Sequence, residues 1–163
     1  CCGKTTIADR VAVILKKKNY LVERLDGDLI RQNFSSDLSF SKKDRDENIR
    51  RATFLAKMLS RNNVVVLASF VSPYRKQRKR ARKEIKNFVE VYVRCPVKIC
   101  MKRDVKGMYK KALEGKIKHF TGVDDPYEEP EHPELTLNTD TDSLEESVKK
   151  VLQTLEESGY ITR

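Results

Sequence analysis

Apolar residues recur along the chain in two patterns, one typical of helices and the other of buried strands. In three stretches they stand three or four positions apart, which is the spacing of one face of an amphipathic helix. The apolar positions of these predicted helices are Ile7, Val11, Ile14 and Leu15, then Ile49, Ala52, Leu55, Ala56 and Leu59, and last Leu144, Val148, Val151, Leu152 and Leu155. Ser41 and Ser143, each with an acidic residue three positions on, predict where the second and third helices begin. Gly159 predicts where the third helix ends.

Shorter apolar runs predict strands between these helices, at about residues 20–25, 64–70, 88–93 and 135–137. The second run is apolar almost throughout, as a strand buried on both faces should be. A basic helix is predicted from about Pro73 to residue 86, and a short helix from Pro96. Strands that alternate with helices predict an α/β fold, a parallel sheet with helices on both faces. Such sheets bind ligands beyond the carboxyl ends of their strands.

Length and charge narrow the class of protein. At 163 residues the chain has the size of one domain, and we predict a single domain over residues 1–163. Its 34 Lys and Arg exceed its 24 Asp and Glu, and the formal net charge of +10 indicates anionic partners such as nucleic acid, an acidic membrane or phosphorylated metabolites. No run of 18 apolar residues exists, so no membrane-spanning segment is predicted. The four cysteines lack paired C-x-x-C spacing, which favours reduced thiols in the cytoplasm over a zinc site or a disulfide framework.

The first six residues carry the clearest chemical signal. They are Cys1, Cys2, Gly3, Lys4, Thr5 and Thr6, and they match the end of the phosphate-binding motif G-x-x-x-x-G-K-[ST]. In that motif backbone N–H groups surround phosphate oxygens, the Lys supplies a positive charge, and the Thr hydroxyl serves Mg²⁺. The helix predicted to start here directs its positive end at the anion. The motif predicts a nucleoside triphosphate site, and we expect the strand before the loop to be missing from this chain.

The first predicted strand runs into a predicted turn that carries two carboxylates. Asp26 and Asp28 flank Gly27, whereas the apolar run at 64–70 ends without the magnesium-binding Asp that many phosphate-loop enzymes have. We therefore expect Asp26 to order Mg²⁺ through water and Asp28 to accept a hydrogen bond from an attacking hydroxyl. The alternative is an Asx-rich turn without a catalytic role. Arg31 favours the functional interpretation, because its planar guanidinium suits a phosphate or sulfate group.

Other candidates have two interpretations each. Arg45 and Asn48 share a helix face that is either exposed to solvent or turned to a ligand, and Phe40 is either a hydrophobic staple or a plate on which a base stacks. The basic residues from 75 to 86 form either a solvated helix surface or a nucleic-acid patch, although no aromatic residues stand between them. The stretch at about 104–134, rich in Lys, Gly and Pro, predicts a basic lid that closes over phosphates.

Taken together, these stretches resemble the adenylyl-sulfate kinase family, which uses ATP to phosphorylate the 3′-hydroxyl of adenylyl sulfate. The matching segments are Gly3-Lys4-Thr5-Thr6, Leu25-Asp26-Gly27-Asp28-x-x-Arg31, Phe40-Ser41-x-x-Asp44-Arg45-x-Glu47-Asn48, Phe70-x-Ser72-Pro73-Tyr74-Arg75, Arg103-Asp104-x-Lys106-Gly107-x-Tyr109, and Phe120-Thr121-Gly122 with Pro126-Tyr127-Glu128. They lie in order over nearly the whole chain. The resemblance implies the fold of the phosphate-loop nucleotide kinases.

The resemblance also implies roles for individual residues. Those implied to contact ATP are Cys1, Cys2, Gly3, Lys4, Thr5, Thr6, Thr139 and Asp142. Those implied to contact adenylyl sulfate are Asp28, Arg31, Phe40, Arg45, Asn48, Val71, Ser72, Lys106, His119 and Phe120, with Phe40 and Phe120 on either side of its adenine. Ser72 matches a serine sometimes described as a phosphoenzyme intermediate, but nothing beside it in sequence supplies a general base, and direct transfer needs no covalent step.

We expect catalytic roles for Lys4, Asp26, Asp28 and Ser72, and a Mg²⁺ site at Thr5 and Asp26. The resemblance implies ATP and Mg²⁺ as cofactors and a homodimer, and it leaves open whether the domain is free-standing or is fused to, or associated with, ATP sulfurylase. Leu29 and Ser39 depart from the family, which usually has Asn and Gly there, and could alter substrate affinity. Two rival interpretations stay open: an inactive nucleotide- or nucleic-acid-binding module, and a kinase of another small alcohol.

Overall fold

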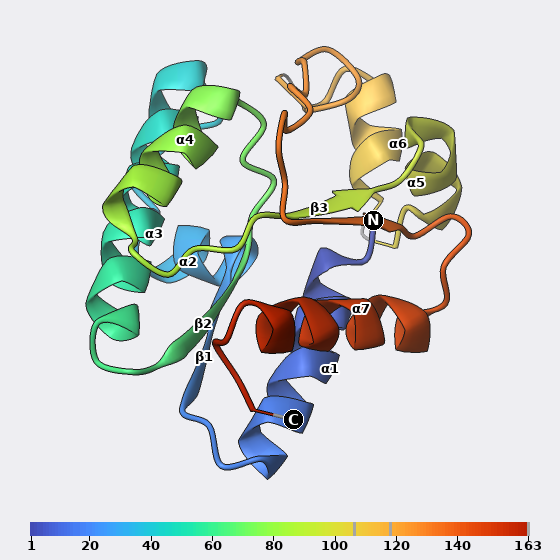
Figure 1. Ribbon diagram of the computed structural model, residues 1–163. Coiled ribbons are helices and arrows are strands. Elements are labelled where there is room, and N and C mark those ends of the chain that lie inside the picture. Colours follow the sequence, from blue (N-terminus) through green and yellow to red (C-terminus); the bar gives the residue numbers. More distant parts are fainter. Residues whose placement is uncertain (106, 118, 163) are drawn as a thin grey trace.

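The computed structural model describes residues 1–105, 107–117 and 119–162, and helices alternate with strands along it (Figure 1). The elements are α1 (Lys4–Lys17), β1 (Val22–Asp26), α2 (Gly27–Asn33), α3 (Lys42–Ser60), β2 (Val65–Ser69), α4 (Arg75–Glu84), β3 (Val91–Arg94), α5 (Val97–Arg103), α6 (Met108–Leu113), β4 (Leu135–Asn138) and α7 (Leu144–Glu157). The three helices and four strands predicted from apolar spacing are all present, with ends that differ by a few residues. Among the described residues, no helix combines the length and the apolar composition that crossing a membrane requires.

The strands form two pairs, and both pairs are parallel as predicted. β1 pairs with β2 in a register that sets Asp26 opposite Ser69. β3 pairs with β4, and Arg94 stands opposite Asn138. The two pairs make separate ladders instead of one continuous sheet, because no strand of the described residues pairs with both β2 and β3. The carboxyl end of β1 therefore meets the carboxyl end of β2, which brings the predicted carboxylate pair beside the loop after residue 69.

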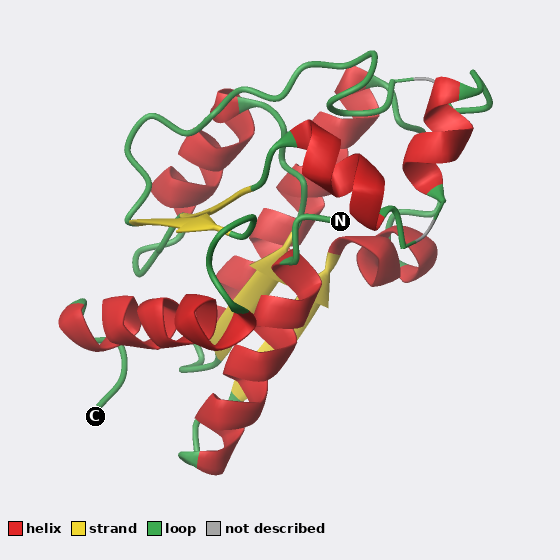
Figure 2. Ribbon diagram, turned by 90° about the vertical axis from the view of Figure 1, so that its right-hand side faces the viewer, coloured by secondary structure: helices red, strands yellow, loops and turns green. Residues whose placement is uncertain are grey.

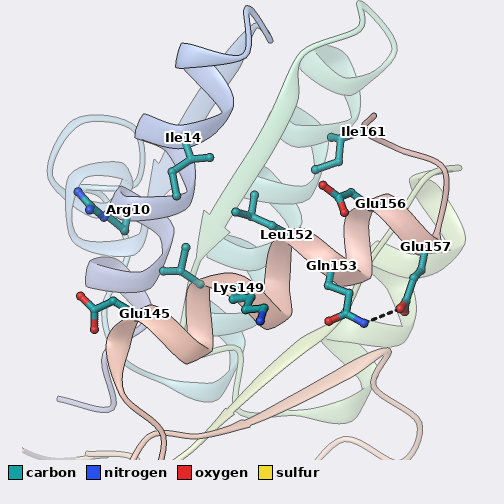
Figure 3. Close-up of a pocket in the computed structure, with 10 residues that line it drawn as sticks. Arg10, Ile14, Glu145, Lys149, Leu152, Gln153, Glu156, Glu157 and Ile161 are labelled. Atoms are coloured by element: carbon teal, nitrogen blue, oxygen red, sulfur yellow. Dashed lines mark hydrogen bonds between the residues drawn. The ribbon is translucent and has the colours of Figure 1, made fainter. Parts of the chain in front are cut away.

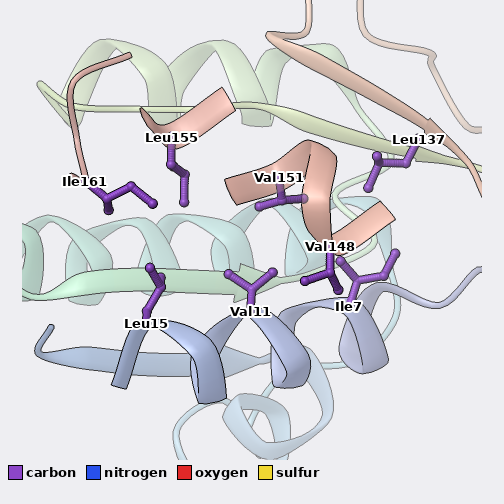
Figure 4. Packing of buried hydrophobic residues seen from close by; sticks show 8 residues of the cluster. All are labelled: Ile7, Val11, Leu15, Leu137, Val148, Val151, Leu155 and Ile161. Atoms are coloured by element: carbon purple, nitrogen blue, oxygen red, sulfur yellow. The ribbon is translucent and has the colours of Figure 1, made fainter. Parts of the chain in front are cut away.

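Helices cover both faces of the β1–β2 pair. On one face α1 packs along the strands, as Figure 2 shows for the helix that follows the N-terminus, and α7 packs on α1. The core on this side is made by Ile7, Val11, Leu15, Leu137, Val148, Val151, Leu155 and Ile161 (Figure 4). Val65 and Leu67 of β2 pack against that core, whereas Val66 between them packs on the other side, under α3. This alternation is the period-2 pattern of a strand covered on both faces.

The predicted helix ends are confirmed where a side chain or a glycine fixes them. Ser41 caps α3 by accepting a hydrogen bond from the N–H of Asp44 (3.2 Å). Ser143 and Glu146 form a reciprocal capping box at the start of α7. Gly159 follows α7 with φ 71°, the left-handed conformation that ends helices and that glycine adopts without strain. Local sequence therefore fixes the ends of the two longest predicted helices.

Three predictions about single elements were wrong. The basic helix begins at Arg75 and not at Pro73, because Pro73 is buried and its carbonyl accepts a hydrogen bond from the N–H of Glu128 (2.8 Å). The strand β2 is not buried throughout, because Ala68 is exposed. The residues after Asp26 form the helix α2 and not a simple turn.

Candidate active site

The phosphate-loop residues lie at the start of α1. Gly3 has φ 88°, a left-handed conformation at the N-cap of the helix, and Lys4 is the first helical residue. The Lys4 Nζ lies 3.5 Å from the Cys2 Sγ, so the ammonium group turns back over its own loop. Exposed backbone N–H groups and a lysine at a helix N-terminus make a site for an anion. The geometry agrees with the prediction of a phosphate-binding loop.

Thr139 holds this loop from the other half of the molecule. Its buried hydroxyl donates to the Cys2 carbonyl (3.0 Å) and lies 3.3 Å from the Arg94 carbonyl. Arg103 donates to the Thr139 carbonyl (2.6 Å). Thr139 thus ties the phosphate loop to the ends of β3 and β4, and its predicted contact with ATP stays a prediction.

Asp142 has structural partners as well. Its carboxylate accepts hydrogen bonds from the N–H of Asn138 (3.2 Å) and from the Lys150 Nζ (2.7 Å). Lys150 holds the pKa of the Asp142 carboxyl below its ordinary value. The side chain closes the turn between β4 and α7, and its predicted contact with the ATP base stays a prediction.

The two halves of the predicted metal site meet. The Thr5 hydroxyl donates to the Asp26 carboxylate with a separation of 3.0 Å, although 21 residues separate them in the chain. The other carboxylate oxygen of Asp26 accepts from the N–H groups of Asp28 and Leu29 and so caps α2. Gly27 fits closely here, because a Cβ would lie 3.2 Å from the Ser69 carbonyl oxygen of the neighbouring strand and would need that strand to shift slightly. Asp28 is exposed in the first turn of α2, directly beside this junction.

Arg31 and Arg45 converge on Phe40. The Arg31 guanidinium lies 4.4 Å from the ring centroid of Phe40, and that of Arg45 lies 5.8 Å from it. Arg31 also donates to the carbonyls of Leu38 and Ser39. Burial lowers the pKa of Arg31 and the nearby charge of Arg45 lowers it further. Two like charges beside an aromatic ring that is half exposed form a site suited to an anion that carries a base.

Arg45 also reaches the segment after α6. It donates to the Phe40 carbonyl (3.0 Å), to the Thr121 hydroxyl (3.2 Å) and to the His119 carbonyl, and it lies 3.9 Å from the Asp125 carboxylate. Arg45 is thus turned inward to other residues, which excludes the solvent-exposed interpretation of this side chain, and its predicted contact with a ligand stays a prediction. The described donors of its guanidinium contact protein groups, so Arg45 connects the Phe40 loop to the predicted lid.

Asn48 and the residues after β2 complete this side. Asn48 is buried, and its Oδ1 lacks a hydrogen-bond partner among the described residues. Such a buried acceptor is unusual in a folded protein, and it can accept a hydrogen bond from a ligand. Val71 is exposed. Ser72 has φ 37°, a left-handed conformation that costs a non-glycine residue about 1–3 kcal/mol and persists only where the surroundings hold it.

The two departures from the family have different surroundings. Leu29 is exposed and faces away from the core. Ser39 donates through its backbone N–H (3.0 Å) and its hydroxyl to the Asp44 carboxylate, and its Oγ accepts from the N–H of Ser41. Ser39 therefore helps to fix the loop that carries Phe40.

The predicted lid contains the short helix α6, which sequence periodicity missed. The Asp104 carboxylate accepts from the N–H groups of Tyr109 and Lys110 and caps this helix. Asp124 accepts from the N–H groups of His119 and Phe120, and these bonds hold the pKa of its carboxyl below the ordinary value although burial opposes the shift. The Phe120 ring packs edge-on against Tyr109 with centroids 4.9 Å apart. The predicted contact of Lys106 lies outside the described residues.

Part of the positive charge of the basic helix α4 is paired with acidic residues at the end of the lid. Arg75 and Lys79 pair with Glu131, and Arg82 pairs with Glu134 at 2.5 Å. Arg82 holds the pKa of the Glu134 carboxyl below its ordinary value. These ion pairs cover part of the positive surface that a nucleic-acid patch would need, so they favour the interpretation of α4 as a structural helix.

One groove lies away from this chemistry, between α1 and α7 (Figure 3). It has a volume of about 600 Å³, and its rim carries charged residues such as Arg10, Glu145 and Lys149. None of the predicted site residues lines it. The candidate active site is therefore assigned from the junction of Thr5 with Asp26 and from the Arg31, Phe40 and Arg45 cluster.

Comparison with known proteins agrees with this geometry. The family model for adenylylsulphate kinase matches residues 1–138. The chain belongs to the adenylyl-sulfate kinase family. Its relatives include the adenylyl-sulfate kinases of Halothermothrix orenii, 55% identical over 98% of this chain and 86% of the relative, and of Rippkaea orientalis, 53% identical over 99% and 89%. Its activity is accordingly that of an adenylyl-sulfate kinase, an enzyme that transfers a phosphoryl group from a nucleotide.

Solved structures of the family have the same fold. The APS kinase CysC of Mycobacterium tuberculosis, determined in complex with AMPPNP and APS, is 39% identical and superposes with a TM-score of 0.91 over 95% of this chain and 91% of that chain. A hexameric APS kinase from Thiobacillus denitrificans is 33% identical with a TM-score of 0.71, over 98% of this chain but 27% of the other. The predicted fold, a phosphate-loop kinase with parallel strands and helices on both faces, is confirmed.

Sequence reasoning gave no role in the site to several residues that contact the segments it did assign. The Tyr74 hydroxyl donates to the Asp125 carboxylate (2.9 Å), and Gly122 and Asp125 close a turn that follows Phe120. Arg78 contacts the carbonyls of Ser72 and Glu128, although it was assigned only to a basic surface. Periodicity carried no signal for Tyr74 and Arg78, because each has a partner 50 or more positions away.

Proposed function

We propose that this chain transfers the γ-phosphoryl group of ATP to the 3′-hydroxyl of adenylyl sulfate, with residues 1–6 at the donor and the Phe40 cluster at the acceptor. The observation that carries this proposal is the hydrogen bond between Thr5 and Asp26. It joins the start of the phosphate-loop helix to the strand end from which Asp28 and Arg31 follow. A triphosphate bound over α1 would therefore present its γ-phosphoryl group beside the acceptor side.

The donor side fits Mg²⁺. The Thr5 hydroxyl and the Asp26 carboxylate are oxygen ligands of the type that Mg²⁺ takes, and they stand 3.0 Å apart. Among the described residues no group of three or more His, Cys, Asp or Glu side chains is arranged to hold a metal. This donor set suits an ion that takes few protein ligands and completes its shell with water and substrate phosphates. When bound, Mg²⁺ supplies positive charge to the phosphate oxygens of the transferred group.

The acceptor side fits a nucleotide with a second anionic group. Arg31 and Arg45 place positive charge beside Phe40, whose exposed face offers a surface on which adenine stacks. Phe120, held by the Asp124 turn, supplies the second ring. The buried Asn48 Oδ1 offers an acceptor for an amino group of a base. Val71, Ser72, His119 and Lys106 are proposed as further contacts, as the resemblance implies.

Asp28 is the proposed group that orients the attacking 3′-hydroxyl. It lies one residue beyond the Gly27 that packs on the end of β2, so it stands between the donor and acceptor sides. Loose phosphoryl-transfer transition states need positioning more than early proton removal. Lys4 stabilises the charge of the transferred group. Ser72 serves as a contact and not as a covalent intermediate, since direct phosphoryl transfer needs no covalent step.

A kinase assay with adenylyl sulfate, ATP and Mg²⁺ tests the proposal. A coupled assay that follows ADP, with the product analysed for phosphate at the 3′ position, should show turnover that needs all three components. Turnover with another alcohol but not with adenylyl sulfate would support the rival kinase. Affinity for single-stranded nucleic acid with a steep salt dependence and without ATP turnover would support the binding module.

The proposal also covers the domain organisation, the assembly and the location of the enzyme. We take residues 1–163 as one kinase domain with a lid at about 104–134, working as a homodimer in the cytoplasm. The hexameric relative, of which this chain covers 27%, supports the idea that such domains also occur within longer chains. That observation is consistent with fusion to, or association with, ATP sulfurylase. Size-exclusion chromatography with light scattering on the purified protein distinguishes a dimer from other assemblies.

A further inference from the structure

Arg78 is an almost fully buried cation in the middle of the basic helix α4, with 8% of its surface exposed. Its Nη1 donates to the Ser72 carbonyl (2.5 Å), and its Nη2 donates to the Glu128 carbonyl. Its Nε lies 2.8 Å from a Glu90 carboxylate oxygen in an ion pair. Its guanidinium stands 5.5 Å from the ring centroid of Tyr127. One side chain thus joins the loop after β2, the end of the lid and the start of β3.

The hydrogen bond from Arg78 to the Ser72 carbonyl stabilises an unfavourable backbone conformation. Ser72 has φ 37°, and it precedes Pro73, whose ring disfavours helical conformations of the residue before it. A non-glycine residue in this conformation relaxes unless neighbouring groups fix it. Arg78 donates to the carbonyl of that residue, so the Ser72 peptide is anchored from inside the protein and not only by its neighbours in the chain.

The hydrogen bond from Arg78 to the Glu128 carbonyl lies near the end of the lid, where the lid contacts the loop after β2. The N–H of Glu128 donates to the Pro73 carbonyl (2.8 Å), and the N–H of Arg75 donates to the Glu128 carboxylate (2.7 Å). The end of the lid therefore lies against the same loop that Arg78 anchors. Three residues earlier, Asp125 contacts Tyr74 and Arg45.

We infer that Arg78 is a positioning residue for adenylyl sulfate: it sets the Val71–Ser72 loop and the lid relative to each other so that both face the acceptor. The inference rests on the proposed function, because it assigns an effect on that substrate. A planar guanidinium donates to two carbonyl groups at fixed angles while its charge pairs with a carboxylate, whereas a lysine offers one charged point. ATP contacts lie on α1 and at Thr139, which Arg78 does not touch in the described structure.

Arg78→Lys tests this role, with Arg82→Lys as the matched control. Arg82 lies one turn further along α4 and pairs with Glu90 and Glu134, but it contacts neither Ser72 nor Glu128. We expect Arg78→Lys to lower kcat/KM for adenylyl sulfate about 10- to 100-fold, as displacements near 1 Å do, and to change the KM for ATP less than about threefold. Arg82→Lys should leave both constants within about threefold of the wild type.

Amide hydrogen exchange gives a readout that does not depend on turnover. In Arg78→Lys the amides at 121–128 should exchange about tenfold faster or more, whereas Arg82→Lys should leave them unchanged. Equal changes in both KM values, or the same exchange in both variants, would make Arg78 a general structural residue and overturn the inference. If the wild type neither binds nor phosphorylates adenylyl sulfate, the proposed function fails and this inference with it. Wild-type turnover with an unaffected Arg78→Lys overturns the inference alone.

Discussion

The donor and acceptor sides of this site are built in different ways. On the donor side, six consecutive residues form the loop and its helix start, and long-range support comes from Asp26 and Thr139. On the acceptor side, Arg45 reaches residues more than 70 positions away, and Tyr74 and Arg78 reach about 50 positions. A phosphate site can therefore form from consecutive residues of one backbone motif. A site that closes around a second substrate depends on contacts that only the folded lid provides.

The largest expected effect is on the carboxylate between the two sides. Asp28→Asn keeps the size of the side chain but removes the negative charge that orients the acceptor hydroxyl. Turnover should fall by roughly 10²–10⁴, while the affinity for adenylyl sulfate stays within about tenfold. Steady-state kinetics at saturating substrates measure this split.

Asp26→Asn is the control for Asp28→Asn. Because Asp26 is proposed to serve Mg²⁺, raised Mg²⁺ should restore part of its rate and should not restore that of Asp28→Asn. Normal turnover in Asp28→Asn, or rescue of that variant alone, would reverse the proposed roles of the two residues.

The next largest effect belongs to the donor side. Lys4→Ala removes the charge beside the transferred phosphoryl group and should lower turnover on the order of a hundredfold or more. The fold should persist, because Lys4 bonds only to Cys2 among the described residues. Circular dichroism and thermal unfolding check the fold. A rate close to that of the wild type would remove the phosphate-loop assignment.

A smaller effect is expected where the lid meets α4. Tyr74→Phe removes the hydrogen bond to Asp125 from a buried hydroxyl, which should cost about 0.5–1.5 kcal/mol of unfolding free energy. The KM for adenylyl sulfate should rise about two- to tenfold, since Asp125 also stands beside Arg45. Denaturant unfolding and kinetics with each substrate varied measure both quantities. An equal rise in the KM for ATP would mean that the two sides are not separate.

The smallest effect concerns pH. Arg82 lowers the pKa of Glu134 in the folded state below its ordinary 4.5, so the folded protein binds fewer protons there than the unfolded chain does. The pair therefore stabilises the fold above about pH 4.5, and this contribution is lost as pH falls through the lower folded value. Glu134→Gln should lower the unfolding free energy at pH 7 by less than about 1 kcal/mol, because the pair is partly exposed.

Thermal unfolding of Glu134→Gln from pH 7 to pH 3 measures this effect. The difference from the wild type should shrink as the solution becomes more acidic. Glu131→Gln is the control, since its exposed pair with Lys79 should matter less. If the difference in stability between Glu134→Gln and the wild type grew toward low pH, the expected direction of the pH dependence would be wrong.

The contrast between the two sides also explains what the sequence could predict. Helical spacing predicted α1, α3 and α7, because each packs one apolar face on a core. The phosphate loop and the pairing of Thr5 with Asp26 followed from local motifs. The helices α2 and α6 were missed because they are short and are fixed by Asp26 and Asp104 caps, with few apolar positions. The inward turn of Arg45 and the burial of Arg78 could not be predicted, because charged residues on helices are usually exposed and their partners lie far away in sequence.

The binding of each substrate to Arg45→Ala tests the central claim most directly. Calorimetric titration should show at least about a tenfold loss of affinity for adenylyl sulfate, because each lost charged hydrogen bond costs roughly 1.5–3 kcal/mol. Affinity for ATP should stay within about twofold of the wild type. Arg50→Ala, which removes an exposed arginine of the same helix paired with Glu47, should leave both affinities unchanged. Equal losses for both substrates in Arg45→Ala would contradict a donor side and an acceptor side that are built separately.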